Sequence, residues 1–353
     1  MKKISIKKNT ETIFAITVSA FFAFILLRFP KICAEGVLNG IRLSSQTVVP
    51  SLFPFLVLSS FVQSSGALAF IGEKTERFFG KIFNLSGQAG CAVLFSLFSG
   101  FPVGCSLASE LYSKNKISRN EAIRIALSSV NAGPAFVIGA VGTTLLSSVR
   151  AGVIIFISLS LSSLLIAFFS RFVLHSSSLS NSSGKETSPL SKSLVSSVYN
   201  GSKSMFIICT WIILFSCFLN VTSSFIKNEA LSLFTEAFLE VTTGCCTLAK
   251  RESPVIVCAV LGWCGMCVHC QVFPYLLKIG LKIRYYLCGR ILHSMLSSII
   301  CYGFFRIFPC EISVFSTETE MIAKTFAVSA PATAGLVLMC VIFILDLDTQ
   351  KEM

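Results

Sequence analysis

Nine continuous apolar segments follow one another through almost the whole chain. Within them apolar residues do not alternate with polar ones, so they predict helices and not the strands of a membrane barrel. Only 13% of the 353 residues are charged and 54% are hydrophobic, which leaves too few charges for a water-soluble surface. We therefore expect an all-α polytopic membrane protein, with apolar segments at about 13–29, 47–62, 88–103, 134–148, 152–173, 204–225, 254–277, 287–308 and 326–345.

The net charge of +12 restricts the partners of the chain. No basic patch is interleaved with aromatic residues on a polar surface, so nucleic acid is not an expected partner. Membrane lipid and a small anionic or heteroaromatic solute fit a basic membrane protein, and a homo-oligomer is compatible with the sequence. Lysines at positions 2, 3, 7 and 8 precede the first apolar run and predict a cytoplasmic N-terminus. A signal peptide ending near Ala34 is the alternative, which the many following spans disfavour.

A polar, serine-rich stretch near the midpoint divides the chain into two membrane halves. We expect a first half with a gate-like domain at residues 1–175, a flexible linker at 176–203, and a second such half at 204–353. The stretches 32–46 and 66–86 read as helices lying at the membrane interface. Together these features predict about eight transmembrane helices and two re-entrant or broken-helix hairpins, with an inverted repeat as one arrangement of the halves.

Several helices are expected to break inside the membrane. Gln88–Phe98 is long enough for about 16 Å of helix, half the hydrocarbon thickness, and Ser-Gly-Phe-Pro-Val-Gly follows at 99–104. A capping box at 118–121 opens another helix, which ends at Asn-Ala-Gly-Pro, 131–134. A single break is an ordinary kink, since Gly and Pro are common in membrane helices. Four breaks favour a buried cavity, because irregular backbone at membrane depth must be buried or line one.

The second half carries similar interruptions. A helix from about Asn228 reaches Glu240 and then Val-Thr-Thr-Gly, and the helix that starts at Pro254 is again 11 residues long before Gly265. Glu240 is either a carboxylate that extends from a helix end to the interface or a site residue that caps amides, pairs with a cation or carries a proton. A polar group such as His269 inside an apolar run is by default part of a pathway, although it can also be a satisfied bundle residue.

Catalysis and metal binding are poorly supported. Cys264, Cys267, His269 and Cys270 are of the types that bind zinc, but they lie along one helix and do not form a cage, so we predict no metal and no cofactor. The other cysteines lie in apolar segments, as packing residues do. No phosphate-binding loop or nucleophile elbow is present, and His175 and His293 lie far from any recognisable partner. We do not expect an enzyme.

The motifs at the breaks, in their order and spacing, resemble those of the YlbJ-type family of sporulation integral membrane proteins. The resemblance extends from about residue 10 to 345 and rests on Ser-Gly-Phe-Pro-Val-Gly at 99–104, Asn-Ala-Gly-Pro at 131–134, Glu-Val-Thr-Thr-Gly at 240–244 and Gly-Met-Cys-Val-His-Cys-Gln at 265–271. This family is built from nucleoside-recognition gate domains, similar to parts of nucleoside transporters. The cysteines at 264, 267 and 270 depart from the small residues expected there.

The resemblance implies a transporter of spore formation, which moves dipicolinic acid across the outer forespore membrane. Nucleosides or another small solute are the alternative cargo, and a non-transporting sporulation scaffold is the alternative class. Ends of half-helices offer free N–H groups to carboxylates, which suits a rigid dianion. The residues expected to bind solute are Ser99, Gly100, Pro102, Gly104, Asn131, Gly133, Pro134, Glu240, Thr243, Gly244, Gly265, His269 and Gln271.

Overall fold

The computed structural model describes residues 2–175, 189–249 and 253–309, and every regular element in these ranges is a helix. Five helices are long and apolar enough to cross a membrane, or six if the bent pair α4–α5 counts as one span. The all-α membrane fold is therefore confirmed, but the count of eight spans is not. The expected span at 326–345 lies outside the described residues. The candidate spans are Pro30–Ser64, Val149–Val173, Leu190–Phe225, Pro254–Ile279 and Ile283–Ile307.

The first half of the chain forms ten helical elements. In chain order they are α1 Lys2–Arg28, α2 Pro30–Leu43, the π-helix η1 Ser44–Val48, α3 Val49–Ser64, α4 Ala67–Phe83, α5 Gly87–Ser99, α6 Val103–Ser113, α7 Arg119–Ser128, the π-helix η2 Ala135–Leu145 and α8 Val149–Val173.

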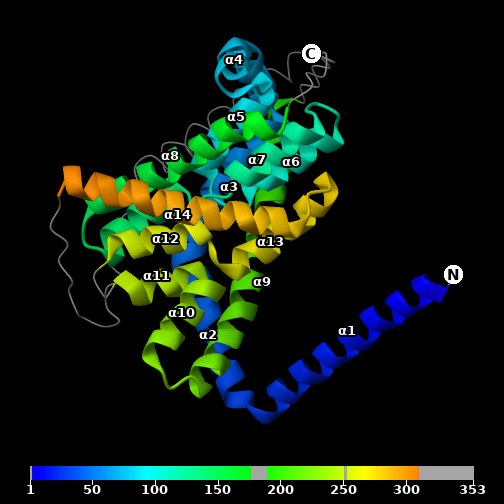
Figure 1. The fold of residues 1–353 in the computed structure, drawn as a ribbon, viewed down its shortest axis with the longest axis vertical. Helices are drawn as coiled ribbons and strands as arrows, with labels where there is room; N and C mark the ends of the chain where they lie inside the picture. The colour runs from blue at the N-terminus through cyan, green and yellow to red at the C-terminus, as the bar shows by residue number, and fades with distance from the viewer. Residues whose placement is uncertain (1, 176–188, 250–252, 310–353) are drawn as a thin grey trace.

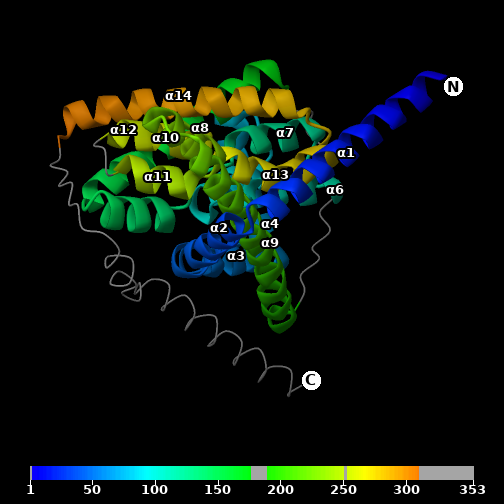
Figure 2. The ribbon, with the colours of Figure 1, turned by 90° about the horizontal axis from the view of Figure 1, so that it is seen from below.

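In residues 189–249 and 253–309 the second half forms six helices, which pack into the first half. They are α9 Leu190–Phe225, α10 Glu229–Leu239, α11 Val241–Ala249, α12 Pro254–Trp263, α13 Gly265–Ile279 and α14 Ile283–Ile307. Helix α9 packs along α2 and α3, α14 packs on α8, and α13 packs on α6 (Figures 1 and 2). One large apolar core therefore combines residues of both halves.

The predicted breaks occur, and they occur in pairs that touch. In the first half, α5 and α6 form a hairpin whose turn contains Gly100, with φ 76°, and a Cβ on Gly100 would lie 3.3 Å from the Gly133 nitrogen at the α7–η2 break. In the second half, α10 and α11 form a hairpin that turns at Glu240. A Cβ on Gly265, at the α12–α13 break, would lie 2.9 Å from the Val241 nitrogen of that turn. Each half thus contains a short-helix hairpin followed by a broken segment.

Helices α4 and α5 meet at a bend of 86°. Two charged residues of α7 hold it. Arg124 donates to the carbonyl oxygens of Phe83 and Asn84 at the end of α4, and Glu121 accepts from the Ser86 nitrogen at the start of α5. Glu121 also completes the predicted capping box with Ser118. These ionic hydrogen bonds satisfy the backbone groups that the bend leaves free.

Three expectations about individual segments need correction. Residues 32–46 were expected to lie at the interface, but they continue into α3 and form one candidate span, Pro30–Ser64. The expected flexible linker at 176–203 is helical from Leu190 onward, where α9 begins, and residues 176–188 lie outside the described residues. The apolar segment 134–148 forms the 11-residue η2, about half of a span.

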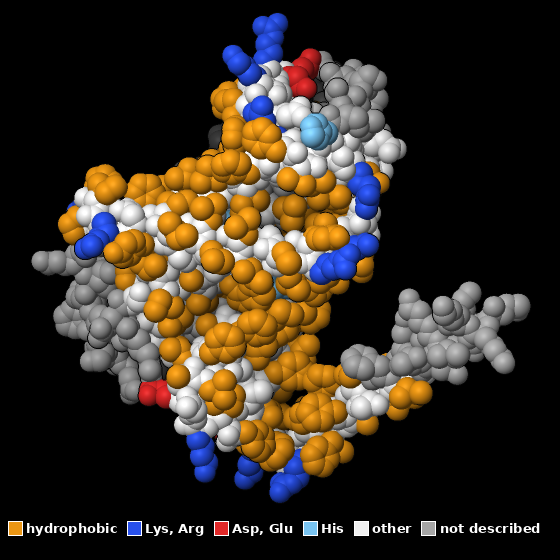
Figure 3. Space-filling view, viewed as in Figure 1, with side chains coloured by type: hydrophobic (Ala, Val, Ile, Leu, Met, Phe, Trp, Pro, Cys, Tyr) orange, Lys and Arg blue, Asp and Glu red, His pale blue; other side chains and the backbone are white. Residues whose placement is uncertain are grey.

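The surface agrees with a lipid environment. Apolar side chains cover most of the face drawn in Figure 3, and Lys and Arg gather at its margins. Large apolar residues such as Phe70, Phe206 and Ile299 are each more than 60% exposed. Helix α1 extends away from the other helices (Figure 1). Exposed apolar area of this extent is typical of a protein whose solvent is lipid.

Two glycines of η2 test how closely η2 packs against α8. A Cβ on Gly142 would lie 2.6 Å from the Cα of Gly152 in α8, whereas a Cβ on Gly139 would meet nothing within 4 Å. We expect Gly142→Ala to lower the free energy of unfolding by about 1–3 kcal/mol, because backbone must move. Gly139→Ala should be neutral or stabilising by up to about 1 kcal/mol. Thermal unfolding in detergent measures both, and equal shifts would contradict the close contact of η2 with α8.

Candidate functional site

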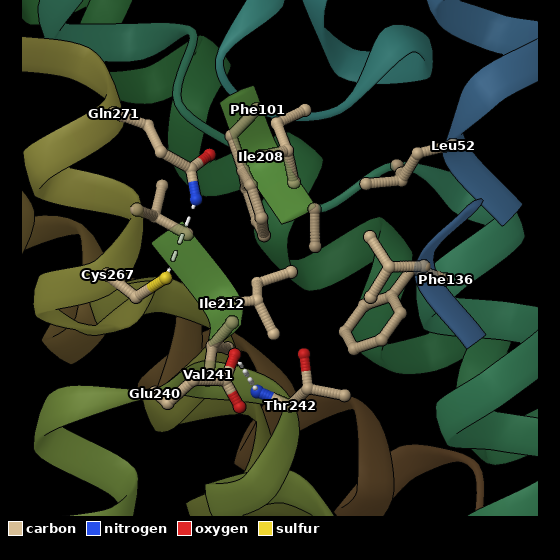
Figure 4. Close-up of a pocket in the computed structure, with 14 residues that line it drawn as sticks. Leu52, Phe101, Phe136, Ile208, Ile212, Glu240, Val241, Thr242, Cys267 and Gln271 are labelled. Atoms are coloured by element: carbon tan, nitrogen blue, oxygen red, sulfur yellow. Dashed lines mark hydrogen bonds between the residues drawn. The ribbon is translucent and has the colours of Figure 1, made fainter. Parts of the chain in front are cut away.

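A buried cavity lies where the broken segments of both halves meet (Figure 4). The first half contributes Phe101 of the α5–α6 turn and the backbone of Gly133 at the α7–η2 break. The second half contributes Glu240 of the α10–α11 turn and Gln271 of α13. Apolar side chains make up most of the wall. The remaining lining residues are Val48, Leu52, Ala132, Phe136, Ile208, Ile212, Val241, Thr242, Cys267 and Val268.

The cavity is nearly closed. It offers about 20 Å³ of room for water, which corresponds to one or two molecules. A pyridine ring with two carboxylates is far larger. A solute of that size therefore requires the helices around the cavity to move apart.

Glu240 caps a helix at the edge of this cavity. Its Oε1 accepts from the Thr242 nitrogen at 3.1 Å and its Oε2 from the Thr243 nitrogen at 2.6 Å (Figure 4). The carboxylate thereby occupies the positive N-terminal end of α11. Of the roles considered for Glu240, capping of backbone amides is the one that the structure shows. Glu240 therefore occupies the Thr242 and Thr243 amides of this half-helix end, which are not free for a solute carboxylate.

Gln271 supplies an amide to the cavity wall. Its Nε2 donates to the Cys267 sulfur at 3.5 Å, and its Oε1 is buried without a hydrogen-bond partner among the described residues. A buried carbonyl oxygen without a partner is costly, so this oxygen is available to a donor on a bound molecule.

The predicted site residues of the first half have different positions. Gly133 lines the cavity, whereas Ser99 donates to the Phe95 carbonyl of its own helix. Gly104 lies against Ser129 of α7, where no side chain fits. Pro102 and Pro134 precede α6 and η2, respectively, and neither lines the cavity.

Some of the predicted site residues of the second half line the cavity, and others do not. Glu240 and Gln271 line the cavity, but Thr243 contributes its backbone nitrogen to the cap. Gly244 provides the close contact between α10 and α11, because a Cβ there would lie 2.5 Å from the Ala237 Cα. Gly265, with φ 75°, sits against the α10–α11 turn. The apolar and aromatic wall residues, such as Leu52, Phe136 and Ile212, carry no polar signal, and sequence reasoning missed them.

Asn131 belongs to a buried hydrogen-bond chain and does not line the cavity. Ser163 of α8 donates to the Asn131 Oδ1 at 2.8 Å, and the His293 Nε2 lies 2.9 Å from the Ser163 oxygen. Because the Ser163 hydrogen is used toward Asn131, the His293 Nε2 is the donor to Ser163. Its Nδ1 then accepts from Arg290 Nη2 at 3.0 Å.

This hydrogen-bond chain shows that the prediction of no partner for His293 is wrong. His293 is fully buried and connects α14 to α8 and, through Ser163, to the α7–η2 break. Arg290, also fully buried, was missed. The available signal was an arginine three residues before a histidine inside the apolar segment 287–308, since ionisable residues at membrane depth mark functional or bundle-interior positions.

The cysteines near the α12–α13 break contact protein groups. Cys264 donates to the Val130 carbonyl oxygen at 3.6 Å, and Cys267 accepts from Gln271. Within residues 2–175, 189–249 and 253–309, no three His, Cys, Asp or Glu side chains converge as metal ligands do. The cavity lining offers apolar contact and a few polar groups to a bound molecule.

Sequence comparisons agree with the motifs at the breaks. The sequence model of the Gate family, described as nucleoside recognition, matches residues 46–174, which include the breaks at 99–104 and 131–134. The sporulation integral membrane protein YlbJ of Bacillus subtilis (strain 168) is 24% identical over 342 residues, covering 82% of this chain and 83% of that protein. No solved structure matches the chain significantly.

The fold and the first-half match define a multi-pass, α-helical membrane protein with a Gate domain. Within this class, the Gate match and the similarity to YlbJ support the YlbJ-type family of sporulation integral membrane proteins, which the motifs also resemble.

Removal of the Glu240 carboxylate tests its structural role. We expect Glu240→Ala to lower the free energy of unfolding by about 1–3 kcal/mol, because two buried N–H groups lose an ionic acceptor. Glu110→Ala is the control, since Glu110 forms an exposed pair with Lys114 at 2.7 Å and should change stability by less than about 1 kcal/mol. Thermal unfolding of both variants gives the comparison. Equal small losses would show that Glu240 does not hold α11.

A double-mutant cycle tests the buried hydrogen-bond chain. Asn131→Ala and Ser163→Ala should each destabilise the protein, because each leaves a buried partner unpaired. The double variant should lose less than the sum, with a coupling energy of about 0.5–3 kcal/mol from unfolding measurements. Strict additivity would contradict the hydrogen bond between these side chains.

Proposed function

We propose that this membrane protein acts in spore formation as a carrier for a small planar anion, dipicolinic acid, across the outer forespore membrane. The family supports the sporulation role, since the similar B. subtilis protein is named a sporulation integral membrane protein. The observation that carries the carrier role is the cavity between two hairpins and two broken segments, one of each from either half. Discontinuous helices around a central cavity are typical of secondary transporters.

The closed cavity is compatible with this role. A carrier alternates between states that open to either side, and a cavity with room for one or two waters is too small to hold the solute in this state. The apolar wall suits the faces of a ring, and the Gln271 amide can bind a polar substituent. The proposal assigns no chemical reaction to the chain. The cytoplasmic N-terminus stays a prediction.

A nucleoside is the second candidate cargo. The Gate match, described as nucleoside recognition, favours it, and so do the aromatic residues Phe101 and Phe136 in the cavity wall. A nucleoside is uncharged and would use the amide of Gln271. The two candidates therefore differ in whether the site must compensate a negative charge.

Uptake by purified protein in liposomes tests the proposal. We expect labelled dipicolinate to enter protein-containing liposomes faster than empty ones, with saturation, and labelled uridine to enter at the rate of empty liposomes. Gln271→Leu should lower dipicolinate uptake roughly tenfold through the loss of a polar contact. Gln46→Leu, the same change at an exposed position of η1, should not.

Uptake equal to that of empty liposomes for both solutes would contradict a carrier that acts alone and would favour a scaffold. Faster entry of uridine than of dipicolinate would replace the proposed cargo with a nucleoside.

A further inference from the structure

Arg290 is a fully buried cation with unused hydrogen-bond donors. Its Nη2 donates to the Gly262 carbonyl oxygen, to the Cys264 sulfur at 3.3 Å and to His293 Nδ1. Its Nε and Nη1 have no hydrogen-bond partner among the described residues. These two atoms carry three of the five N–H hydrogens of a guanidinium.

The other buried charges of the described chain are satisfied. Arg124 donates to carbonyl oxygens of α4 and α8 and to the Ser170 hydroxyl. The carboxylates of Glu121 and Glu240 each accept backbone N–H groups. In the described ranges, the one ion pair is the exposed pair of Glu110 and Lys114. Arg290 therefore has no counter-charge among the residues that the structure describes, and a buried unpaired charge is strongly unfavourable.

A second buried donor without a partner lies near Arg290. His269 is fully buried, its Nδ1 lies 3.1 Å from the Tyr286 hydroxyl, and its Nε2 has no partner. When the Tyr286 hydroxyl donates to the His269 Nδ1, the ring hydrogen of the neutral His269 lies on Nε2, which is then a donor. Tyr286 precedes Arg290 by four residues, or about one turn, in α14, so the two side chains lie on the same face of this helix.

The start of α13 adds a third positive element. This 15-residue helix begins at Gly265 and has no side-chain cap, in contrast to α11, whose first amides bind Glu240. Its N-cap residue, Cys264, is the one whose sulfur contacts Arg290. An uncapped helix N-terminus beside an unpaired arginine is a site that favours an anion.

We propose that Arg290, the uncapped N-terminus of α13 and the His269 Nε2 form a binding site for the carboxylate of a planar aromatic acid. The inference rests on the proposed carrier function and names its substrate class and its charge-binding residue. The guanidinium supplies N–H donors and the missing counter-charge, and the helix end supplies free amides.

Aromatic rings adjoin this site and fit the ring of such an acid. The Trp263 and His269 rings are 4.5 Å apart edge to face, and Phe238 stacks on Trp263 at 5.4 Å. Phe238 is 39% exposed, so the aromatic row extends from the surface to His269. Cys264 and Gly265 at the α12–α13 break both have left-handed backbone, with φ of 76° and 75°.

Ligand-induced thermal stabilisation of the full-length protein in detergent tests the site. The probes are pyridine-2,6-dicarboxylate, benzoate and the uncharged pyridine-2,6-dicarboxamide. We expect both carboxylates, and not the amide, to stabilise the parent protein. Arg290→Gln should weaken carboxylate binding about thirtyfold or more. Arg290→Lys, which keeps the charge without the planar fork, should weaken it about tenfold.

Arg150→Gln is the matched control, because it removes the same charge from an exposed position at the start of α8. It should bind the carboxylates as the parent does. If Arg290→Gln does not fold, the site is tested by comparing carboxylate binding of Arg290→Lys with that of the parent protein. The site is overturned if neither carboxylate stabilises the parent, if the amide binds equally well, or if both folded Arg290 variants bind like the parent.

Failure of this site and failure of the carrier function have different signatures. Benzoate stabilisation that depends on Arg290, without dipicolinate uptake by liposomes, would leave the site in place and remove the proposed cargo. Dipicolinate uptake that is unchanged in Arg290→Lys and Arg290→Gln would leave the carrier in place and remove the site.

Discussion

Backbone groups freed at helix breaks must find partners inside the protein, because neither lipid nor an apolar core can supply them. This chain meets that requirement with charged side chains. Arg124 and Glu121 bind the two sides of the α4–α5 bend, Glu240 binds the first amides of α11, and Arg290 binds the Gly262 carbonyl near the end of α12. The buried charges of the described chain thus lie where regular hydrogen bonding ends.

Most of these partners come from distant segments, so satisfying a break also joins separate parts of the chain. Arg290 of α14 binds the α12–α13 break, and through His293 and Ser163 it is connected to Asn131 at the α7–η2 break. Arg119 of α7 donates to the carbonyls of Ile279 and Gly280, where α13 ends. The two halves are consequently held together by polar contacts at breaks as well as by the shared apolar core.

The sequence predicts the location of the breaks well, because Gly, Pro and capping residues act locally. The Ser118 capping box and the turn at Gly100 are such cases. The sequence predicts hydrogen-bond partners poorly. Nothing local to His293 shows that Ser163, 130 residues earlier, lies beside it. The apolar cavity wall cannot be predicted from the sequence for a similar reason. Leu52 and Ile212 resemble any other apolar residue of a membrane helix, and only the packing of the helices brings them to the cavity.

The tight closure of the cavity has a consequence for the membrane around the protein. Space for one or two waters, walled mainly by apolar side chains, is not a continuous water path. In the closed state this cavity therefore gives protons and inorganic ions no path across the membrane, and electrochemical gradients are preserved. A solute that used this route would cross one molecule per conformational cycle, so its flux would reach a ceiling set by the protein's motion and not by the concentration gradient.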